Sequence, residues 1–267
     1  MSDIITSKNL DDIIESNKKI RDDVIRLVNE TKVRFNTSVV TSADRFAFKI
    51  LKENNLIQMP VEDKYFGGAI IVKGNLRIPI INTAQPRVYQ YFVAWHEIYH
   101  LFYDNNIQNE THEVKIDMEI NERMADYFAA NMILGNVYDY YYSLEDENFI
   151  DRIIKCMDVY KAPYKAVLIQ LYEDALLKYN DSNLKKSILN NFDNQPENLI
   201  GKFEELGLDS ELVKPSYLFD TGDLEKRIVK NIKGNPEVTY HEDNYKHFLN
   251  IKRTVKKLVE DLSYDNR

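Results

Sequence analysis

The sequence predicts an α+β fold in which helices predominate and one short region forms a β-sheet. Most of the chain places apolar residues three and four positions apart, which is the spacing of helices that bury one face. Residues 68–81 instead contain two runs of β-branched residues separated by a glycine turn. Hydrophobic residues make up 44% and charged residues 29% of the chain, as in an ordinary globular protein.

The first third of the chain is expected to contain two helices and then two strands. Apolar residues recur at helical spacing over residues 10–33, opposite a charged face, and a second helix is predicted over residues 43–56. Strands are predicted over residues 68–72 and 76–81, joined by the glycine turn. Because proline cannot donate a backbone hydrogen bond, Pro79 predicts that its strand lies at an edge or end of the sheet.

Two longer helices are expected next, with a polar loop between them. Asn82 or Thr83 can cap the first of these helices, which should end near Tyr103. The loop covers residues 104–112, and the second helix is predicted over residues 116–134, where a Gly-Asn pair ends it. These two helices carry the side chains that point to a function.

The remainder of the chain is predicted to be helical almost throughout. We expect a first domain over residues 1–140 and a helical C-terminal region over residues 141–267, with a helix-turn-helix-like unit near residues 160–206. The expected helices of this region cover residues 148–160, 163–179, 184–192, 197–206, 224–233 and 244–262.

The charge and the absence of targeting signals narrow the classes of function. A formal net charge of −8 disfavours binding to nucleic acid or to an anionic membrane through bulk electrostatics, so neither partner is expected. No apolar run approaches the length of a membrane span, and the start of the sequence lacks the basic and apolar segments of a secretory signal. We therefore expect a cytoplasmic protein in which the single cysteine, Cys156, is a buried structural residue.

The strongest signal is a His-Glu-x-x-His sequence in the first of the two long helices. His96 and His100 are four residues apart, so their imidazoles lie on one face of a helix and can reach the same metal ion. Glu97 lies beside that face, where its carboxylate can act on a water molecule rather than bind the ion. All other residues between positions 92 and 102 are apolar or aromatic, which predicts a buried helix. Burying three such polar side chains together is costly unless a divalent cation compensates them.

A third ligand is expected from the second long helix, because catalytic zinc sites use three protein ligands and leave one position open. Glu122 and Asp126 are four residues apart, so Glu122 can bind the metal while Asp126 accepts a hydrogen bond from the outer nitrogen of a ligand histidine. The same two residues could instead be surface charges of an amphipathic helix. Glu119 is the next candidate ligand, and His112 and Glu113 in the loop are weaker ones.

Three segments of the chain resemble the ImmA/IrrE family of zinc metallopeptidases. Residues 78–82 resemble the family's strand that ends in Asn, and residues 91–101 resemble its Phe-x-x-Ala-x-His-Glu-x-x-His-Leu helix. Residues 122–130 are similar to its Glu-x-x-Ala-Asn/Asp-x-Phe-Ala-Ala stretch. The chain departs from the family pattern at Tyr99, where glycine is commoner, and at Gly135, where the second motif often ends in proline.

The resemblance implies a fold and a set of residue roles. It implies a zincin-like peptidase core, in which a small sheet packs on the His-Glu-x-x-His helix and on a second ligand helix. It also implies that His96, His100 and Glu122 bind Zn²⁺ and that Glu97 is the catalytic residue. The implied substrate is a helix-turn-helix transcriptional repressor, whose cleavage would switch on a stress, phage or mobile-element response.

We therefore expect a zinc-dependent endopeptidase that acts on such a repressor. Zinc would acidify a water molecule, and Glu97 would take the proton of that water and deliver it to the leaving amine. The alternative is a non-catalytic regulatory protein with a structural zinc site, which binds a repressor or DNA through its helical C-terminal region. A structural site needs no general base, so an intact Glu97 favours the enzyme.

Overall fold

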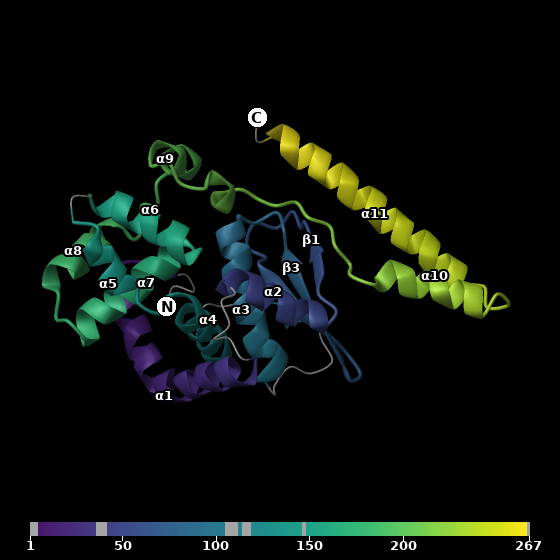
Figure 1. Cartoon of the computed structure of the whole chain (residues 1–267), viewed down its shortest axis with the longest axis horizontal. Coiled ribbons are helices and arrows are strands. Elements are labelled where there is room, and N and C mark those ends of the chain that lie inside the picture. The colour runs from purple at the N-terminus through teal and green to yellow at the C-terminus, as the bar shows by residue number, and fades with distance from the viewer. Residues whose placement is uncertain (1–4, 36–41, 105–111, 114–118, 146–147, 266–267) are drawn as a thin grey trace.

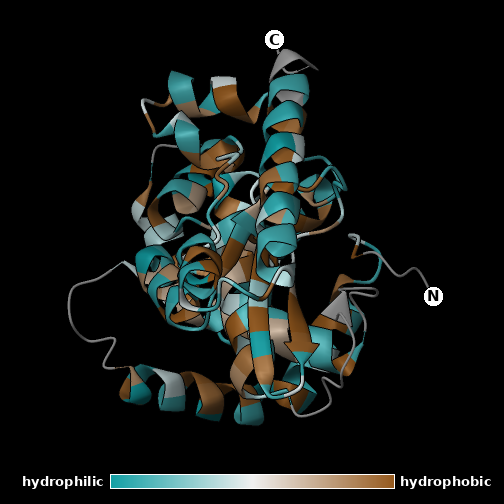
Figure 2. Ribbon diagram, turned by 90° about the vertical axis from the view of Figure 1, so that its right-hand side faces the viewer, coloured by the Kyte–Doolittle hydropathy of each residue, from teal (hydrophilic) through white to brown (hydrophobic). Residues whose placement is uncertain are grey.

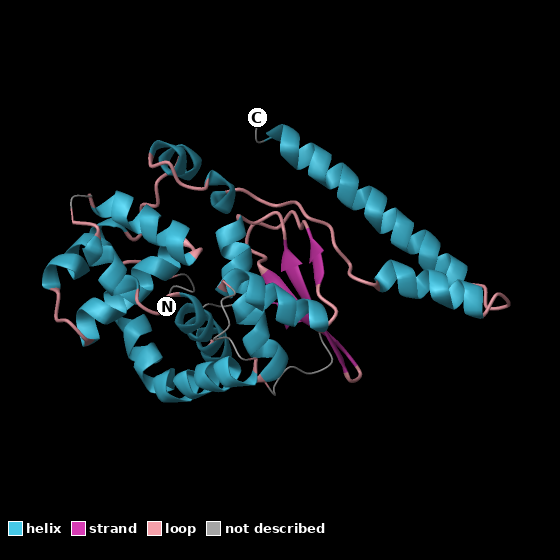
Figure 3. Ribbon diagram, viewed as in Figure 1, coloured by secondary structure: helices cyan, strands magenta, loops and turns pink. Residues whose placement is uncertain are grey.

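Helices predominate in the fold, and one small sheet lies beside them, which confirms the predicted α+β class (Figure 3). The computed structural model describes residues 5–35, 42–104, 112–113, 119–145 and 148–265. None of the helices in this described part of the chain is long and apolar enough to cross a lipid bilayer.

The two N-terminal helices form where the apolar spacing predicts them. They are α1 (Leu10–Arg34) and α2 (Ala43–Glu53). One polar side chain on the buried face of α1, that of Asn17, is almost completely shielded from solvent. The apolar residues that α1 buries, at helical spacing, are Leu10, Ile13, Ile14, Ile20, Val24 and Val28.

The sheet has the strand order β1-β3-β2-β4 within the described residues. The predicted hairpin forms β2 (Gly68–Lys73) and β3 (Leu76–Asn82), which pair antiparallel through a turn at Gly74, where φ is +60°. β1 (Ile57–Met59) was not predicted and runs parallel to β3, and β4 (His112–Glu113) pairs antiparallel with β2.

The expectation that Pro79 places its strand at an edge of the sheet is wrong, because β3 lies between β1 and β2. The backbone N–H of Asn82 points to the β2 side, and that of Thr83 points to β1. Because the N–H groups of successive residues in a strand point to opposite sides, an N–H at position 79 would point towards β1. β1 pairs with β3 only from Ile80 onward. The missing N–H of Pro79 therefore costs no ladder hydrogen bond, although the strand is internal.

The two long helices are α3 (Arg87–Phe102) and α4 (Ile120–Ile133). The expected cap of α3 is wrong, because Pro86 occupies the N-cap. The side chains of Asn82 and Thr83 form hydrogen bonds with other segments instead. The side-chain oxygen of Asn82 accepts the backbone N–H of Val61 at 2.8 Å, and its amide donates to the carbonyl of Phe66 at 2.7 Å. The predicted start of α4 at residue 116, and most of the loop before it, lie outside the described residues.

The C-terminal region is helical, as predicted, and shares its core with the first part of the chain. One continuous hydrophobic cluster contains buried side chains from both sides of residue 140, among them Trp95, Phe128, Leu171 and Phe203. α5 was not predicted as a helix. The helices of this part are α5 (Val137–Ser143), α6 (Phe149–Tyr160), α7 (Tyr164–Leu177), α8 (Ser182–Asn191), α9 (Leu199–Glu205) and the 3₁₀ helix η1 (Ser210–Val213).

An extended segment, residues 214–220, here called the strap, runs back along the sheet beside β1 (Figure 1). Gln58 and Asp220 exchange two backbone hydrogen bonds of 2.8 and 2.9 Å, and Tyr217 donates its N–H to the carbonyl of Thr83. The strap leads to a projecting hairpin of α10 (Leu224–Gly234) and α11 (Tyr240–Asp265). Figure 2 shows hydrophilic and hydrophobic residues interspersed along α11.

Candidate metal site

Close packing of α3 against α4 builds the candidate site. Every residue of α3 from Ala94 to Leu101 is buried, as its apolar sequence predicts. On the facing side of α4, Ala125 and Ala129 are fully buried, and these small side chains let the two helix backbones approach each other. Polar side chains from both helices therefore meet in a buried region.

His96, His100 and Glu122 come together at this helix contact. Their exposed fractions are 5%, 1% and 1%, and one ligand atom from each residue lies within 4.8 Å of the others. The two Nε2 atoms are 3.1 Å apart, and the Glu122 carboxylate lies 3.2 Å from His96 Nε2 and 3.5 Å from His100 Nε2. This buried group could hold a metal ion.

The outer nitrogens of both imidazoles contact carboxylates. His96 Nδ1 lies 2.9 Å from Asp126, as the sequence predicts, and His100 Nδ1 lies 3.0 Å from Asp104. A carboxylate at this distance accepts the Nδ1–H, which orients the ring and makes Nε2 the atom that could bind a metal ion. Both imidazoles are thus oriented with Nε2 towards Glu122.

Asp104 was not predicted, although the sequence carries a signal for it. It lies four residues after His100, which is the same spacing that suggested Asp126 as a partner of the site. Arg77 of β3 fixes this end of α3, because its guanidinium donates to the carbonyl oxygens of His100, Leu101 and Asp104 at 3.0 to 3.2 Å. The sheet therefore helps to hold the Asp104 carboxylate beside His100.

Glu97 lies against β2 and is 2% exposed. Its Oε1 atom has no hydrogen-bond partner among the described residues. Burial raises the pKa of Glu97 to about 7. A carboxyl group with such a pKa can both accept and return a proton near neutral pH.

Mutual hydrogen bonds shift the pKa values of the two histidines and of Glu122. Burial lowers the pKa of His96, but hydrogen bonds to Asp126 and Glu122 outweigh it and raise that pKa well above its usual value. The pKa of His100 is raised in the same way by Asp104 and Glu122. Burial raises the pKa of Glu122, but its hydrogen bonds to the two histidines lower it by more. A cation bound here would compete with protons for the imidazole nitrogens.

The other candidate ligands do not join the group within the described residues. Glu119 is exposed at the N-cap of α4, one turn before Glu122. The side chains of His112 and Glu113 lie outside the described part of the chain. Between the two glutamates that the sequence left open, the structure therefore brings Glu122 to the histidines.

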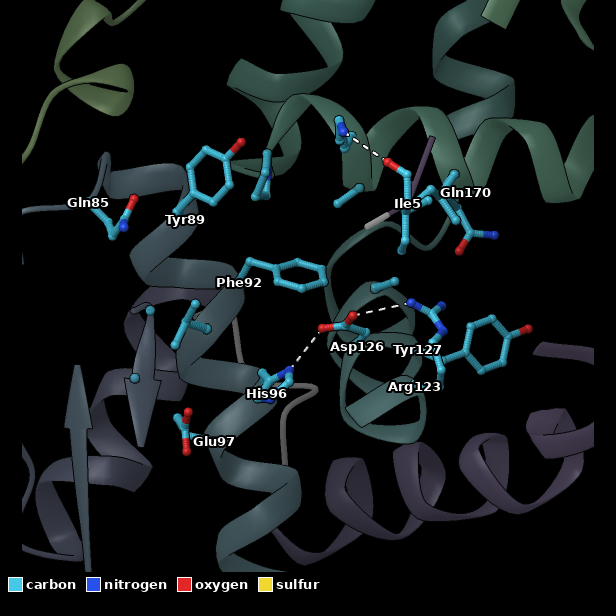
Figure 4. Close-up of a pocket in the computed structure, with 18 of the residues that line it drawn as sticks. Ile5, Gln85, Tyr89, Phe92, His96, Glu97, Arg123, Asp126, Tyr127 and Gln170 are labelled. Carbon is cyan, nitrogen blue, oxygen red and sulfur yellow. Dashed lines mark hydrogen bonds and ion pairs between the residues drawn. The ribbon is translucent and has the colours of Figure 1, made fainter. Parts of the chain in front are cut away.

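A cavity of about 350 Å³ adjoins the site (Figure 4). His96 and Glu97 line it where it adjoins the ligand group, and Asp126 of α4 contributes to the same wall. Apolar side chains form much of the remaining lining, including Tyr89 and Phe92 of α3, Ala130 of α4, and Ala166 and Ile169 of α7. A molecule bound in this cavity would contact both His96 and α7.

Known proteins do not supply a function for this site. Comparison of the chain with models of protein families, with curated proteins and with solved structures found no match.

Proposed function

We propose that this chain is a zinc-dependent endopeptidase, with His96, His100 and Glu122 as metal ligands and Glu97 as general base. One observation carries the proposal: two imidazole nitrogens and one carboxylate converge, and a second buried carboxylate stands beside them with an oxygen that has no hydrogen-bond partner among the described residues. Two imidazoles and a carboxylate form a common ligand set of catalytic zinc sites, in which the fourth position is left for water or substrate.

The charges of the site support a divalent cation. Glu97, Asp104 and Glu122 are buried, and Asp126 is half-buried, so four carboxylates face two imidazoles in a small volume. Buried carboxylates are strongly destabilising unless cations or hydrogen bonds compensate them. Zinc is a borderline cation that accepts both imidazole nitrogen and carboxylate oxygen, so the ligand set fits it.

The residues divide the work of hydrolysis. Zinc in this site would supply Lewis acidity, which lowers the pKa of a water molecule and polarises the scissile carbonyl. Glu97, buried beside the ligand group, takes the proton from the attacking water and returns it to the leaving amine. Asp104 and Asp126 hold the Nδ1–H groups of the two histidines, which keeps Nε2 available as the ligand atom.

The substrate that we propose is a helix-turn-helix transcriptional repressor in the cytoplasm. This part of the proposal rests on the similarity of residues 78–82, 91–101 and 122–130 to the ImmA/IrrE family. The cavity beside Glu97 supports a polypeptide substrate in general, because its apolar lining can take a side chain next to the scissile bond.

The test compares the wild-type protein with Glu97→Gln, both loaded with zinc and both incubated with the repressor encoded beside the gene. The amide cannot accept a proton, so Glu97→Gln should keep one zinc per chain and lose about 100-fold or more of the cleavage rate. Loss of zinc in Glu97→Gln would mean that Glu97 is a ligand and that the roles are wrong. Zinc binding by the wild-type protein without any cleavage would favour the non-catalytic alternative.

A further inference from the structure

A chain of buried polar contacts leaves the metal site and crosses to α1. One oxygen of Asp126 contacts His96, and the other accepts a hydrogen bond from the guanidinium of Arg123 at 3.2 Å. Figure 4 shows these two contacts in succession, from His96 to Asp126 and from Asp126 to Arg123. A second nitrogen of Arg123 donates to the side-chain oxygen of Asn17 on α1 at 2.9 Å.

The chain of contacts continues from α1 to α7. The amide of Asn17 donates to one oxygen of Glu173 at 3.0 Å, and the hydroxyl of Tyr127 donates to the other at 2.6 Å. Asn17 is 1% exposed, and Arg123 and Glu173 are each 3% exposed. Four helices, α1, α3, α4 and α7, therefore meet in one connected polar network inside the protein.

Packing alone does not account for this network. A buried guanidinium and a buried carboxylate are expensive to desolvate, and apolar residues of similar shape often stabilise a core equally well or better. Arg123 and Asp126 are three residues apart on α4, and such a pair contributes little when it is exposed. Here Asn17 holds the guanidinium from a different helix, so the orientation of Arg123 towards Asp126 is fixed.

We propose that Arg123 positions Asp126, and through it the imidazole of His96, while Asn17 and Glu173 hold Arg123 from α1 and α7. Arg123 is a positioning residue, because none of its contacts reaches the metal-ligand atoms. The proposal rests on the metal site of the proposed function and not on its peptidase activity. It assigns part of the metal affinity to α7, which lies beyond the expected domain boundary at residue 140.

The informative variant is Asn17→Ala. Alanine preserves α1 but removes the acceptor of Arg123 and the donor to Glu173. The guanidinium then loses its contact with α1, so its orientation towards Asp126 is no longer fixed. Loss of a residue that orients a ligand histidine typically lowers metal affinity 10- to 100-fold, so we expect about 10-fold weaker zinc binding here.

The structure offers a matched control in Tyr172→Phe. The Tyr172 hydroxyl of α7 donates to Asp11 of α1 at 2.8 Å, so this variant also removes a side-chain hydrogen bond between the same two helices. It leaves the network from His96 to Glu173 intact. Arg123→Lys is a second test, because lysine keeps the charge but cannot contact Asn17 and Asp126 with two separate nitrogens.

The experiment measures zinc affinity by competition with a chelator, and the visible absorption of the cobalt-substituted protein, whose bands report ligand geometry. Thermal unfolding of each variant shows that it is folded. We expect Asn17→Ala and Arg123→Lys to bind zinc about 10-fold more weakly and to shift the cobalt bands. Tyr172→Phe should match the wild-type protein within about twofold, because it leaves this network untouched.

The outcomes separate this proposal from the proposed function. Wild-type affinity and unchanged cobalt bands in both Asn17→Ala and Arg123→Lys would overturn the positioning role, as would an equal loss in Tyr172→Phe. If Asn17→Ala does not fold, Arg123→Lys decides the question. A wild-type protein that binds neither zinc nor cobalt refutes both proposals, whereas one that binds zinc but cleaves nothing refutes only the peptidase.

Discussion

Gly68 allows β2 to approach α3 at Glu97, the proposed general base. A Cβ atom placed there would lie 2.7 Å from Val93 Cγ1, 2.8 Å from the carbonyl oxygen of Ile80 and 2.9 Å from Glu97 Oε1. Each of these distances is shorter than a real Cβ contact. The Ile80 oxygen belongs to the sheet backbone, so Gly68→Ala has to shift the β2–β3 backbone as well as the side chains of Val93 and Glu97.

The expected cost of Gly68→Ala has two parts. Overfilling a packed interior by one methyl group typically destabilises a protein by about 1 to 3 kcal/mol. Moving the Glu97 oxygen from 2.9 Å to the 3.4 Å of an ordinary contact requires a shift of about 0.5 Å. Because a misplacement of about 1 Å can lower a rate 100-fold, we expect about a 10-fold lower kcat. Zinc content should stay at one per chain, since the ligand atoms are not among the close contacts of this Cβ.

The assay combines urea unfolding, zinc content and the rate of repressor cleavage. Gly135→Ala is the matched control, because a Cβ atom at Gly135 meets nothing within 4 Å. It should leave stability, zinc and rate unchanged. A Gly68→Ala protein with wild-type stability and kcat would refute the placement of Glu97 against β2, and loss of zinc without loss of stability would refute its separation from the ligand group.

The geometry of the site leads to four further predictions. Glu122→Ala should lower zinc affinity by orders of magnitude, whereas Glu119→Ala should change it by less than about threefold, because Glu119 is exposed at the N-cap; a chelator titration that ranks them in reverse would exclude Glu122 as the ligand. Asp104→Ala should weaken zinc binding about 10- to 100-fold, as expected for a carboxylate that orients a ligand histidine, and unaltered affinity would show that the Asp104–His100 contact does not orient the ligand. As the pH is lowered, protons compete with zinc, so zinc affinity should fall by about tenfold per pH unit for each histidine that must lose a proton. Because the pKa values of His96 and His100 are raised, this loss of affinity should already begin at a pH above 6.5. Without zinc, the protonated forms of His96 and His100 stabilise the fold. This stabilisation is complete below about pH 6.5 and is lost as the pH rises through the raised pKa values. Thermal unfolding measured from about pH 6 to about pH 9 would detect the loss.

The sequence predicted the elements whose determinants are local. Apolar spacing located α1 to within one residue at its C-terminal end, and the glycine turn located the β2–β3 hairpin. β1 was missed because three residues carry no measurable periodicity and its partner Ile80 is more than twenty residues away. The tolerance of Pro79 in an internal strand was also unpredictable, because it depends on where β1 begins and not on the strand that contains the proline.

The same distinction separates the predicted from the missed parts of the site. His96, His100 and Asp126 follow from four-residue spacing on helices, and Asp104 could have been found by the same rule. No local pattern indicates that Asn17 contacts Glu173, which is 156 positions away in the sequence. Contacts of this kind depend on how whole helices pack, so a single sequence cannot reveal them.

The strap has a consequence for the solubility of the protein. β1 is the outermost strand on its side of the sheet, and Asp220 occupies the backbone groups of Gln58 that would otherwise face solvent. A strand whose backbone groups are free can recruit a strand from a second molecule, which is a common route to self-association. A variant that ends before residue 214 would keep every proposed zinc ligand but uncover β1. It should bind zinc normally and yet form concentration-dependent aggregates, which would assign the strap a role against self-association that is separate from metal binding.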